Sequence, residues 1–298
     1  MKVGFALPVS GSWATPDNVL TVARRAEELG YATLWTFQRL LTPSPNQLAP
    51  VYQSVLDPTV VLAHVAAVTR SVDLGVAVVN APFQSPSLLA KQLATLDLLS
   101  HGRLVPGLGL GWLPEEFTAA GVPYARRGAR MEEYLRCLRA IWDGEEPASF
   151  SGEFYEVPPS NSHPRPARRL PVLLGGDVPA ALARAGRLAD GWISSSRVPP
   201  TELGERISVV RAAASEAGRD PGSLAFVCRG VLRDAPRTGP LTGPLDRVRT
   251  EDLPLLEAQG VTEVFLDLNF DPTVGAPDAD AASSMARASE ALEAFAQV

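Results

Sequence analysis

Strand-like and helix-like segments alternate eight times along this chain of 298 residues. The strand-like segments are short, apolar runs without polar alternation, which is typical of parallel strands buried on both faces. Eight such units favour a closed (β/α)8 TIM barrel over an open sheet, and barrels of this length are routinely one domain, here residues 1–298. The expected strands are Lys2–Pro8, Thr33–Phe37, Val72–Val79, Arg103–Leu108, Val172–Leu174, Gly191–Ser194, Leu224–Leu232 and Val261–Leu268.

Proline and capping residues mark where the intervening helices begin. Asp57-Pro58 is an N-cap followed by proline, and Pro16 and Pro86 open helices in the same way. The segment 144–170 is too long for an ordinary connection, which indicates an insertion after the fourth helix. The expected helices are Pro16–Leu29, one from Pro58, Pro86–Leu99, about Glu115–Asp143 with a break near Gly121, Pro179–Leu188, Thr201–Ala217, Leu245–Gln259 and Ala279–Ala296, with a Pro/Gly-rich loop at Ala235–Pro244.

Composition excludes several classes of protein. Hydrophobic residues make up 46% of the chain, enough for a large core, and the net charge of −6 argues against non-specific nucleic-acid binding. No apolar run reaches about 18 residues and no signal peptide is evident, so we expect a cytoplasmic protein without a membrane span. The two cysteines, Cys137 and Cys228, fit neither a disulfide framework nor a metal site.

Two glycine-rich segments stand where strands end, the position of the active site in such barrels. Gly175-Gly176-Asp177-Val178 joins a strand to a helix, and its backbone N–H groups suit a phosphate. A glycine turn without a ligand would have the same sequence pattern. Gly107-Leu-Gly109-Leu-Gly111 lacks the spacing of a dinucleotide fingerprint. Its glycines would let a flat ring approach the backbone, or would serve close strand packing.

Other polar and aromatic residues near the strand ends favour structural roles. Glu116, after Glu115 at a helix start, is typical of a partner for the helix dipole. Trp112 and Trp192 suit the core better than a cofactor wall. Arg126, Arg127 and Arg130 suit a solvated face or ion pairs with the acids of the long helix. His64 and His101 are expected to be structural, whereas His163 would reach the pocket if the insertion folded over it.

Several motifs, taken together, resemble the luciferase-like monooxygenase superfamily, particularly the actinobacterial branch that uses the deazaflavin coenzyme F420. Lysine occurs only at Lys2 and Lys91, a coding bias that suits an actinobacterial origin. The motifs are Asp57-Pro58, Leu74-Gly75-Val76, Leu89 to Asp97, Ser100-His101-Gly102-Arg103, Gly107 to Trp112, Glu115-Glu116-Phe117, Gly121-Val122-Pro123, Arg126-Arg127, Gly175-Gly176 and Asp190-Gly191-Trp192.

The resemblance implies a bulged third strand, with a non-prolyl cis peptide behind the ring of the cofactor, here at Ala77–Val78. It also implies that the insertion covers part of the pocket mouth. The cofactor-binding residues are then expected to be Gln38, Arg39, Ala77, Val78, Asn80, Gly109, Trp112, Gly175, Gly176, Asp177 and Val178.

The chain departs from the family at the end of the second strand. Many deazaflavin relatives carry Asp-His there, whereas this chain has Gln38-Arg39. Arginine stays protonated and is a poor proton shuttle, so Arg39 would stabilise an anionic reduced cofactor or an anionic substrate group. Trp112 stands where sugar-phosphate dehydrogenase relatives have an acid, which argues against sugar-phosphate oxidation. Gln38, Arg39 and Asn80 are the candidate catalytic residues.

These implications favour an F420-dependent oxidoreductase. It would transfer hydride between the deazaflavin and a C=C, C=N or C=O group of a small or peptide natural product, in secondary metabolism. One alternative is a flavin mononucleotide (FMN)-dependent monooxygenase that uses reduced flavin and O2. A second is a cofactor-binding protein without turnover, because of Gln38-Arg39. The expected partners are a homodimer mate and a separate reductase that regenerates reduced cofactor; no metal is expected.

Overall fold

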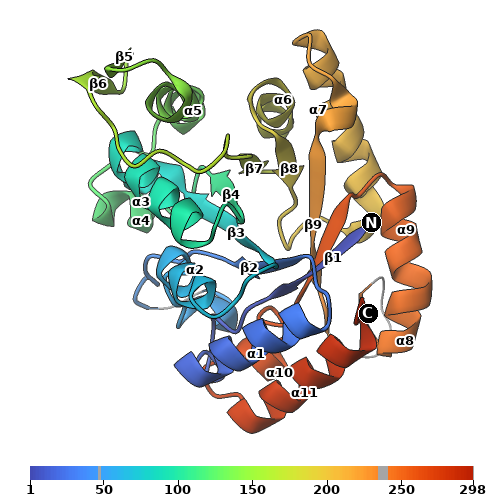
Figure 1. Cartoon of the computed structure of the whole chain (residues 1–298). Helices are drawn as coiled ribbons and strands as arrows, with labels where there is room; N and C mark the ends of the chain where they lie inside the picture. Colours follow the sequence, from blue (N-terminus) through green and yellow to red (C-terminus); the bar gives the residue numbers. More distant parts are fainter. Residues whose placement is uncertain (46–47, 234–240, 298) are drawn as a thin grey trace.

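Eight parallel strands close into a barrel in the computed structural model, which describes residues 1–45, 48–233 and 241–297. Around the barrel the order is β1-β10-β9-β8-β7-β4-β3-β2, so neighbours in the chain are neighbours in space (Figure 1). The predicted (β/α)8 TIM barrel is confirmed. The barrel strands are β1 Lys2–Ala6, β2 Thr33–Thr36, β3 Asp73–Asn80, β4 Leu104–Gly109, β7 Leu173–Gly175, β8 Gly191–Ile193, β9 Ala225–Val231 and β10 Glu263–Asp267.

Helices surround the barrel, and their starts follow the predicted caps. The side chains of Thr15, Asp57 and Ser85 each accept a hydrogen bond from a first-turn amide, and proline follows each. The predicted break separates α4 from α5, at Gly121 with φ of 68°. The helices are α1 Pro16–Glu28, α2 Pro58–Ala66, α3 Pro86–Leu99, α4 Pro114–Ala119, α5 Arg127–Asp143, α6 Pro179–Leu188, α7 Leu203–Glu216, α8 Leu245–Arg247, α9 Leu253–Ala258, α10 Pro272–Gly275 and α11 Ala281–Ala294.

Two segments differ from the expected pattern near the end of the chain. The predicted helix Leu245–Gln259 consists of α8, a π-helical turn at Val248–Asp252, and α9. The short helix α10 follows β10 and was not expected. Of the predicted loop Ala235–Pro244, residues 235–240 lie outside the described part of the chain.

Aromatic side chains fill part of the interior of the barrel. The Trp35 ring stacks on Phe265, with centroids 5.0 Å apart, and its Nε1 donates to Glu263 at 2.8 Å. A Cβ added at Gly75 would lie 2.4 Å from the Trp35 ring, so only glycine leaves room for it. The Trp35 ring and its neighbours therefore fill the barrel interior at this level.

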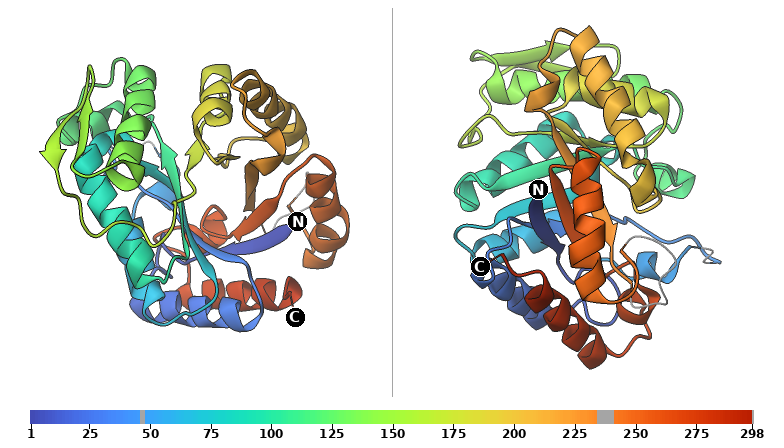
Figure 2. Two further views of the ribbon diagram at one scale, coloured as in Figure 1. Left: turned by 45° about the horizontal axis from the view of Figure 1, so that its top comes forward. Right: turned by 90° about the vertical axis from the view of Figure 1, so that its right-hand side faces the viewer.

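The 144–170 segment folds away from those carboxyl ends. It contains the hairpin β5 Ala148–Ser151 and β6 Glu156–Ser160, which lies outside α5 (Figure 2). Buried Glu133 of α5 accepts hydrogen bonds from three consecutive hairpin amides, at residues 153–155. Arg168 then donates to the carbonyls of Gly102 and Leu104, at the amino end of β4.

The prediction that the insertion covers the pocket mouth is therefore wrong. Its contacts go to α5, α3 and the opposite end of the barrel. His163, in the same segment, pairs with Glu146 at 2.8 Å, and its carbonyl accepts from Lys91 of α3. His163 does not reach the pocket.

Among the described helices, none combines the length and apolarity that crossing a lipid bilayer requires.

Candidate active site

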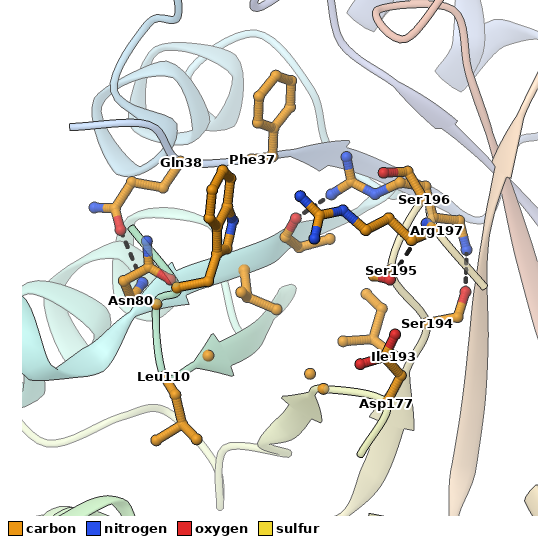
Figure 3. A pocket seen from close by; sticks show the side chains of 18 of the residues that line it. Phe37, Gln38, Asn80, Leu110, Asp177, Ile193, Ser194, Ser195, Ser196 and Arg197 are labelled. Carbon is orange, nitrogen blue, oxygen red and sulfur yellow. Dashed lines mark hydrogen bonds between the residues drawn. The ribbon is translucent and has the colours of Figure 1, made fainter. Parts of the chain in front are cut away.

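A pocket of about 330 Å³ opens at the carboxyl ends of the barrel strands (Figure 3). Ligand sites in proteins commonly begin at about 300 Å³, so it is large enough for part of a cofactor and a small substrate. Every residue predicted to bind the cofactor or to act in catalysis lines this one pocket: Gln38, Arg39, Ala77, Val78, Asn80, Gly109, Trp112, Gly175, Gly176, Asp177 and Val178. The structure thus brings together positions up to 140 residues apart.

Val78 forms the floor of the pocket, on the predicted bulge of β3. The pairing of β3 with β4 shifts between Val76 and Val79, and the Ala77–Val78 peptide is cis, as expected. A Cβ added at Gly109 would lie 2.4 Å from Val78 Cγ2, and one at Gly175 would lie 3.1 Å from Val78 Cγ1. Glycine at these positions of β4 and β7 leaves the space that the Val78 side chain occupies.

Gln38 ties the end of β2 to this floor. Its Oε1 accepts a hydrogen bond from the backbone N–H of Asn80 at 2.8 Å. This bond holds the Gln38 amide beside the end of β3, within the pocket. Gln38 and Asn80 offer neutral donors and acceptors there, and neither can carry a proton as an acid or a base.

The glycine turn after β7 presents free backbone donors to the pocket. Gly176 has φ of 117°, where L side chains are strained, and its carbonyl accepts from Trp192 Nε1 at 2.7 Å. The amides of residues 176–178 donate to no other described residue. Because they precede the ten-residue helix α6, they also meet its positive dipole end, which suits a phosphate. Trp192 is buried, as predicted, and it anchors this turn.

Arg39 is not a free cation. Its Nη1 lies 2.8 Å from Oε2 of Glu116, and the two side chains are 4% and 0% exposed. The N–H directions are not aligned with Oε2, so the contact is an ion pair rather than a well-formed hydrogen bond. Tyr52 and Trp112 flank the guanidinium at 4.6 and 4.8 Å.

Glu116 corrects one expectation and Trp112 another. Glu116 Oε1 accepts from the backbone N–H of Leu40 at 2.7 Å, and its other oxygen meets Arg39. It is thus a buried counterion for the β2 loop, whereas we expected a partner of the helix dipole. Trp112 is 39% exposed and lines the pocket, so it is not a core residue.

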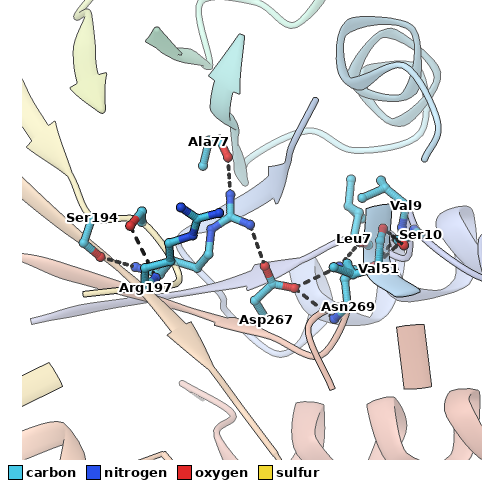
Figure 4. Close-up of polar contacts among 11 residues, drawn as sticks. Leu7, Val9, Ser10, Val51, Ala77, Ser194, Arg197, Asp267 and Asn269 are labelled. Carbon is cyan, nitrogen blue, oxygen red and sulfur yellow. Dashed lines mark hydrogen bonds and ion pairs between the residues drawn. The ribbon is translucent and has the colours of Figure 1, made fainter. Parts of the chain in front are cut away.

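A second buried arginine crosses the barrel above the floor. Arg229 of β9 donates from Nη2 to the Ala77 carbonyl, and its Nη1 meets Asp267 at 3.1 Å (Figure 4). In the barrel order β9 and β3 are four strands apart and therefore opposite each other. The Asp267 carboxylate continues to Asn269, whose side chain binds the backbone of the loop after β1. Burial raises the pKa of Asp267, while Arg229 opposes that rise.

Two further arginines line the pocket without an ion pair to any described residue. Arg197 follows β8 and lies over the Trp112 ring at 4.9 Å. Arg127 begins α5 and lies over the Tyr124 ring at 4.0 Å. Its neighbour Gly128 is close to Arg184 of α6. We expected Arg127 on a solvated face or paired with an acid of the long helix; it instead lines the pocket and forms no ion pair with a described residue.

Sequence reasoning did not assign functions to several of these residues. Arg229, Asp267 and Arg197 stand at strand ends, where the barrel rule directs attention, but their pairing depends on which strands face each other. Tyr52 comes from the long loop after β2, and no local pattern places it beside Arg39.

The pocket lining contains few groups that could transfer protons. Asp177 is the lone carboxylate among the described lining residues, and no histidine joins it. The described residues also form no cluster of three or more metal-ligating side chains. Burial raises the pKa of Cys228 to about 12 and of Cys137 to about 11, so neither thiol is activated. The arrangement therefore suits a protein that binds and orients reactants.

Fold and pocket define a barrel with a glycine turn after β7 and a bulged third strand at its pocket. The luciferase-like monooxygenase family matches residues 1–233, and the chain belongs to this family. An uncharacterized protein of Mycobacterium tuberculosis is 36% identical over 233 residues, which cover 74% of this chain and 80% of that protein.

The named relatives and the similar solved structures include both F420-dependent enzymes and a monooxygenase. The F420-dependent glucose-6-phosphate dehydrogenase of Amycolatopsis mediterranei is 29% identical over 200 residues, 66% of this chain and 58% of that enzyme. An F420-dependent secondary alcohol dehydrogenase superposes with a TM-score of 0.79 at 16% identity, over 98% of both chains. The monooxygenase RslO1 of Streptomyces bottropensis superposes with a TM-score of 0.77 at 24% identity, over 99% of this chain and 98% of that one. These two likenesses concern the fold.

Proposed function

We propose that this protein is an oxidoreductase that binds coenzyme F420 and reduces or oxidises a small organic substrate. The observation that carries the proposal is the pairing of the Val78 floor with the free amides of residues 176–178 in one pocket. The first suits the face of a planar ring and the second suits a phosphate on the same molecule. The similarity to the F420-dependent enzyme of Amycolatopsis mediterranei supports the choice of cofactor.

The residues of the chain bind and orient in this proposal. When bound, the deazaflavin supplies the carbon that accepts or donates hydride. Val78 would support one face of the ring, and Gln38 and Asn80 would offer hydrogen bonds to its polar edge. The amides of residues 176–178 would bind the phosphate, and Arg127, which lines the same pocket, would offset its charge.

The substrate would occupy the rest of the pocket, between Trp112 and the loop after β8. A C=C, C=N or C=O group of a natural product fits this description, since the pocket provides orientation and hydrogen bonds. When the substrate is reduced, turnover requires a separate reductase that regenerates the reduced cofactor.

The experiment that tests the proposal is a titration of the purified protein with F420 and, separately, with FMN, each oxidised and reduced, followed by calorimetry. We expect F420 to bind more tightly than FMN. Tighter binding of reduced FMN, with oxygen from labelled O2 in the product, would establish the monooxygenase alternative instead. F420 binding without redox exchange across a broad substrate panel would establish a cofactor-binding protein without turnover.

A matched pair of glycine variants tests the phosphate turn. Gly176→Ala places a Cβ at φ of 117° and 2.8 Å from Ala181 Cβ, so the turn must distort. We expect F420 affinity to fall at least tenfold. Gly218→Ala imposes a similar left-handed strain, at φ of 72°, on an open surface site with nothing within 4 Å. It should leave the affinity unchanged, and equal losses in both variants would contradict the assignment.

A further inference from the structure

Arg197 and Arg127 are the arginines of the described pocket lining that have no ion pair with a described residue. Arg39 is paired with Glu116 and Arg229 with Asp267, both in buried contacts. Arg127 packs on Tyr124, outside the pocket lining, whereas Arg197 packs on Trp112 within it. Arg197 forms no ion pair with any described residue, although the loop that carries it joins the pocket wall.

Its position is nevertheless defined. The guanidinium packs over the Trp112 ring at 4.9 Å, and its side chain extends from the loop into the pocket (Figure 3). The loop backbone is held by Ser195, whose Oγ accepts from the Arg197 amide at 3.3 Å. The adjoining hydroxyl of Ser194 accepts from the Arg229 amide at 3.0 Å. A guanidinium that stacks on a ring and has unused N–H donors along its edge can bind a planar anion such as a carboxylate.

We propose that Arg197 binds a carboxylate of the substrate, so that the enzyme acts on organic acids that carry a reducible or oxidisable group. This inference rests on the proposed function and names its substrate class. Glu116 and Asp267 are taken up by Arg39 and Arg229, so the charge of Arg197 is left without an ion-pair partner among the described residues. A bidentate contact to Arg197 would hold the acid against Trp112, above the Val78 floor.

The acidic tail of the cofactor is the other source of a carboxylate, and geometry favours the substrate. The glycine turn follows β7 and opens α6, and Gly128, next to Arg127, lies close to Arg184 of α6. Arg197 follows β8 and stacks on Trp112, which comes from the loop after β4. It shares the Trp112 ring with Arg39, at the end of β2, and therefore lies on a different wall of the pocket from the glycine turn after β7.

The test compares an acid with its neutral amide. Cinnamate and cinnamamide, which have nearly the same shape, are titrated by calorimetry into the protein, both alone and saturated with oxidised F420. The wild type should bind cinnamate about tenfold more tightly than cinnamamide. Arg197→Met should abolish the preference, and Arg197→Lys should retain part of it, because lysine keeps the charge and loses the planar fork. The preference should also weaken at high salt, since Arg197 is exposed.

Arg127→Met is the matched control, because it removes the other unpaired guanidinium of the pocket. It should weaken F420 binding and keep the preference for cinnamate. The proposal is overturned if wild type binds both probes equally, or if Arg197→Met retains the preference. It is also overturned if Arg197→Met weakens F420 binding more than threefold, since Arg197 would then serve the cofactor. A failure of F420 to bind would refute the proposed function separately, because the acid preference is also measured without cofactor.

Discussion

Replacement of Arg39 by methionine should destabilise the protein strongly, because it leaves the Glu116 carboxylate buried without a cation. At 2.8 Å the two charges attract by about 6 kcal/mol for an effective dielectric constant of about 20. The cost of burying both groups offsets much of this attraction. Removing one partner keeps the cost and loses the attraction, so we expect a loss of about 3–5 kcal/mol in the free energy of unfolding.

The assay is urea unfolding at pH 7 of four proteins: wild type, Arg39→Met, Glu116→Gln and the double variant. The Glu116→Gln side chain keeps an oxygen to accept from the Leu40 amide, which Glu116 Oε1 binds at 2.7 Å. The double variant should therefore lose about 1–3 kcal/mol less than the sum of the single losses. Arg25→Met breaks an exposed pair with Glu293 and should leave the unfolding midpoint unchanged.

The same variants separate two roles for Arg39. If its charge is neutralised by Glu116, the double variant should bind reduced F420 within about threefold of wild type. Additive stability losses, or an Arg39→Met loss below about 1 kcal/mol, would refute the buried ion pair. A large loss of affinity for reduced F420 in the stable double variant would show instead that Arg39 stabilises an anionic cofactor.

Two further predictions concern buried carboxylates. Arg229→Met should lower the free energy of unfolding by about 3–5 kcal/mol, because it leaves Asp267 without its cation. Adding Asp267→Asn should restore part of that loss. Fully additive losses in urea unfolding would contradict this coupling. Burial raises the pKa of Glu263 above its unfolded value of about 4.5, so folding favours the protonated form and the contribution of Glu263 to the free energy of unfolding falls as pH rises above 4.5. Glu263→Gln keeps the acceptor for Trp35 and should gain stability relative to wild type between pH 4.5 and 7; a constant difference across urea unfolding at several pH values would exclude this titration.

The fold and the wall of the site could be predicted because both depend on local patterns. Apolar strands, N-caps such as Asp57, and glycines at strand ends are encoded within a few residues, and a barrel then places all strand ends at one rim. The direction taken by the 144–170 segment could not be predicted, since it depends on Glu133 of α5 capping the hairpin. The sequence around Glu133 does not indicate that its carboxylate binds the amides of a hairpin about 20 residues further along the chain.

The charge arrangement of the pocket is equally hidden from local patterns, and it changes how Gln38-Arg39 is interpreted. Taken alone, an arginine in place of a histidine suggests either a catalytic cation or a lost activity. With Glu116 fully buried against it and with aromatic rings on either side, Arg39 is instead a compensated replacement that closes the wall after β2. In the proposed reaction, proton transfer would fall to hydroxyl groups, to Asp177 or to solvent, because the amide side chains of Gln38 and Asn80 are neither acids nor bases. A reaction limited by hydride transfer tolerates such a site better than one that depends on a positioned acid, which is a further reason to test electron-poor unsaturated acids first.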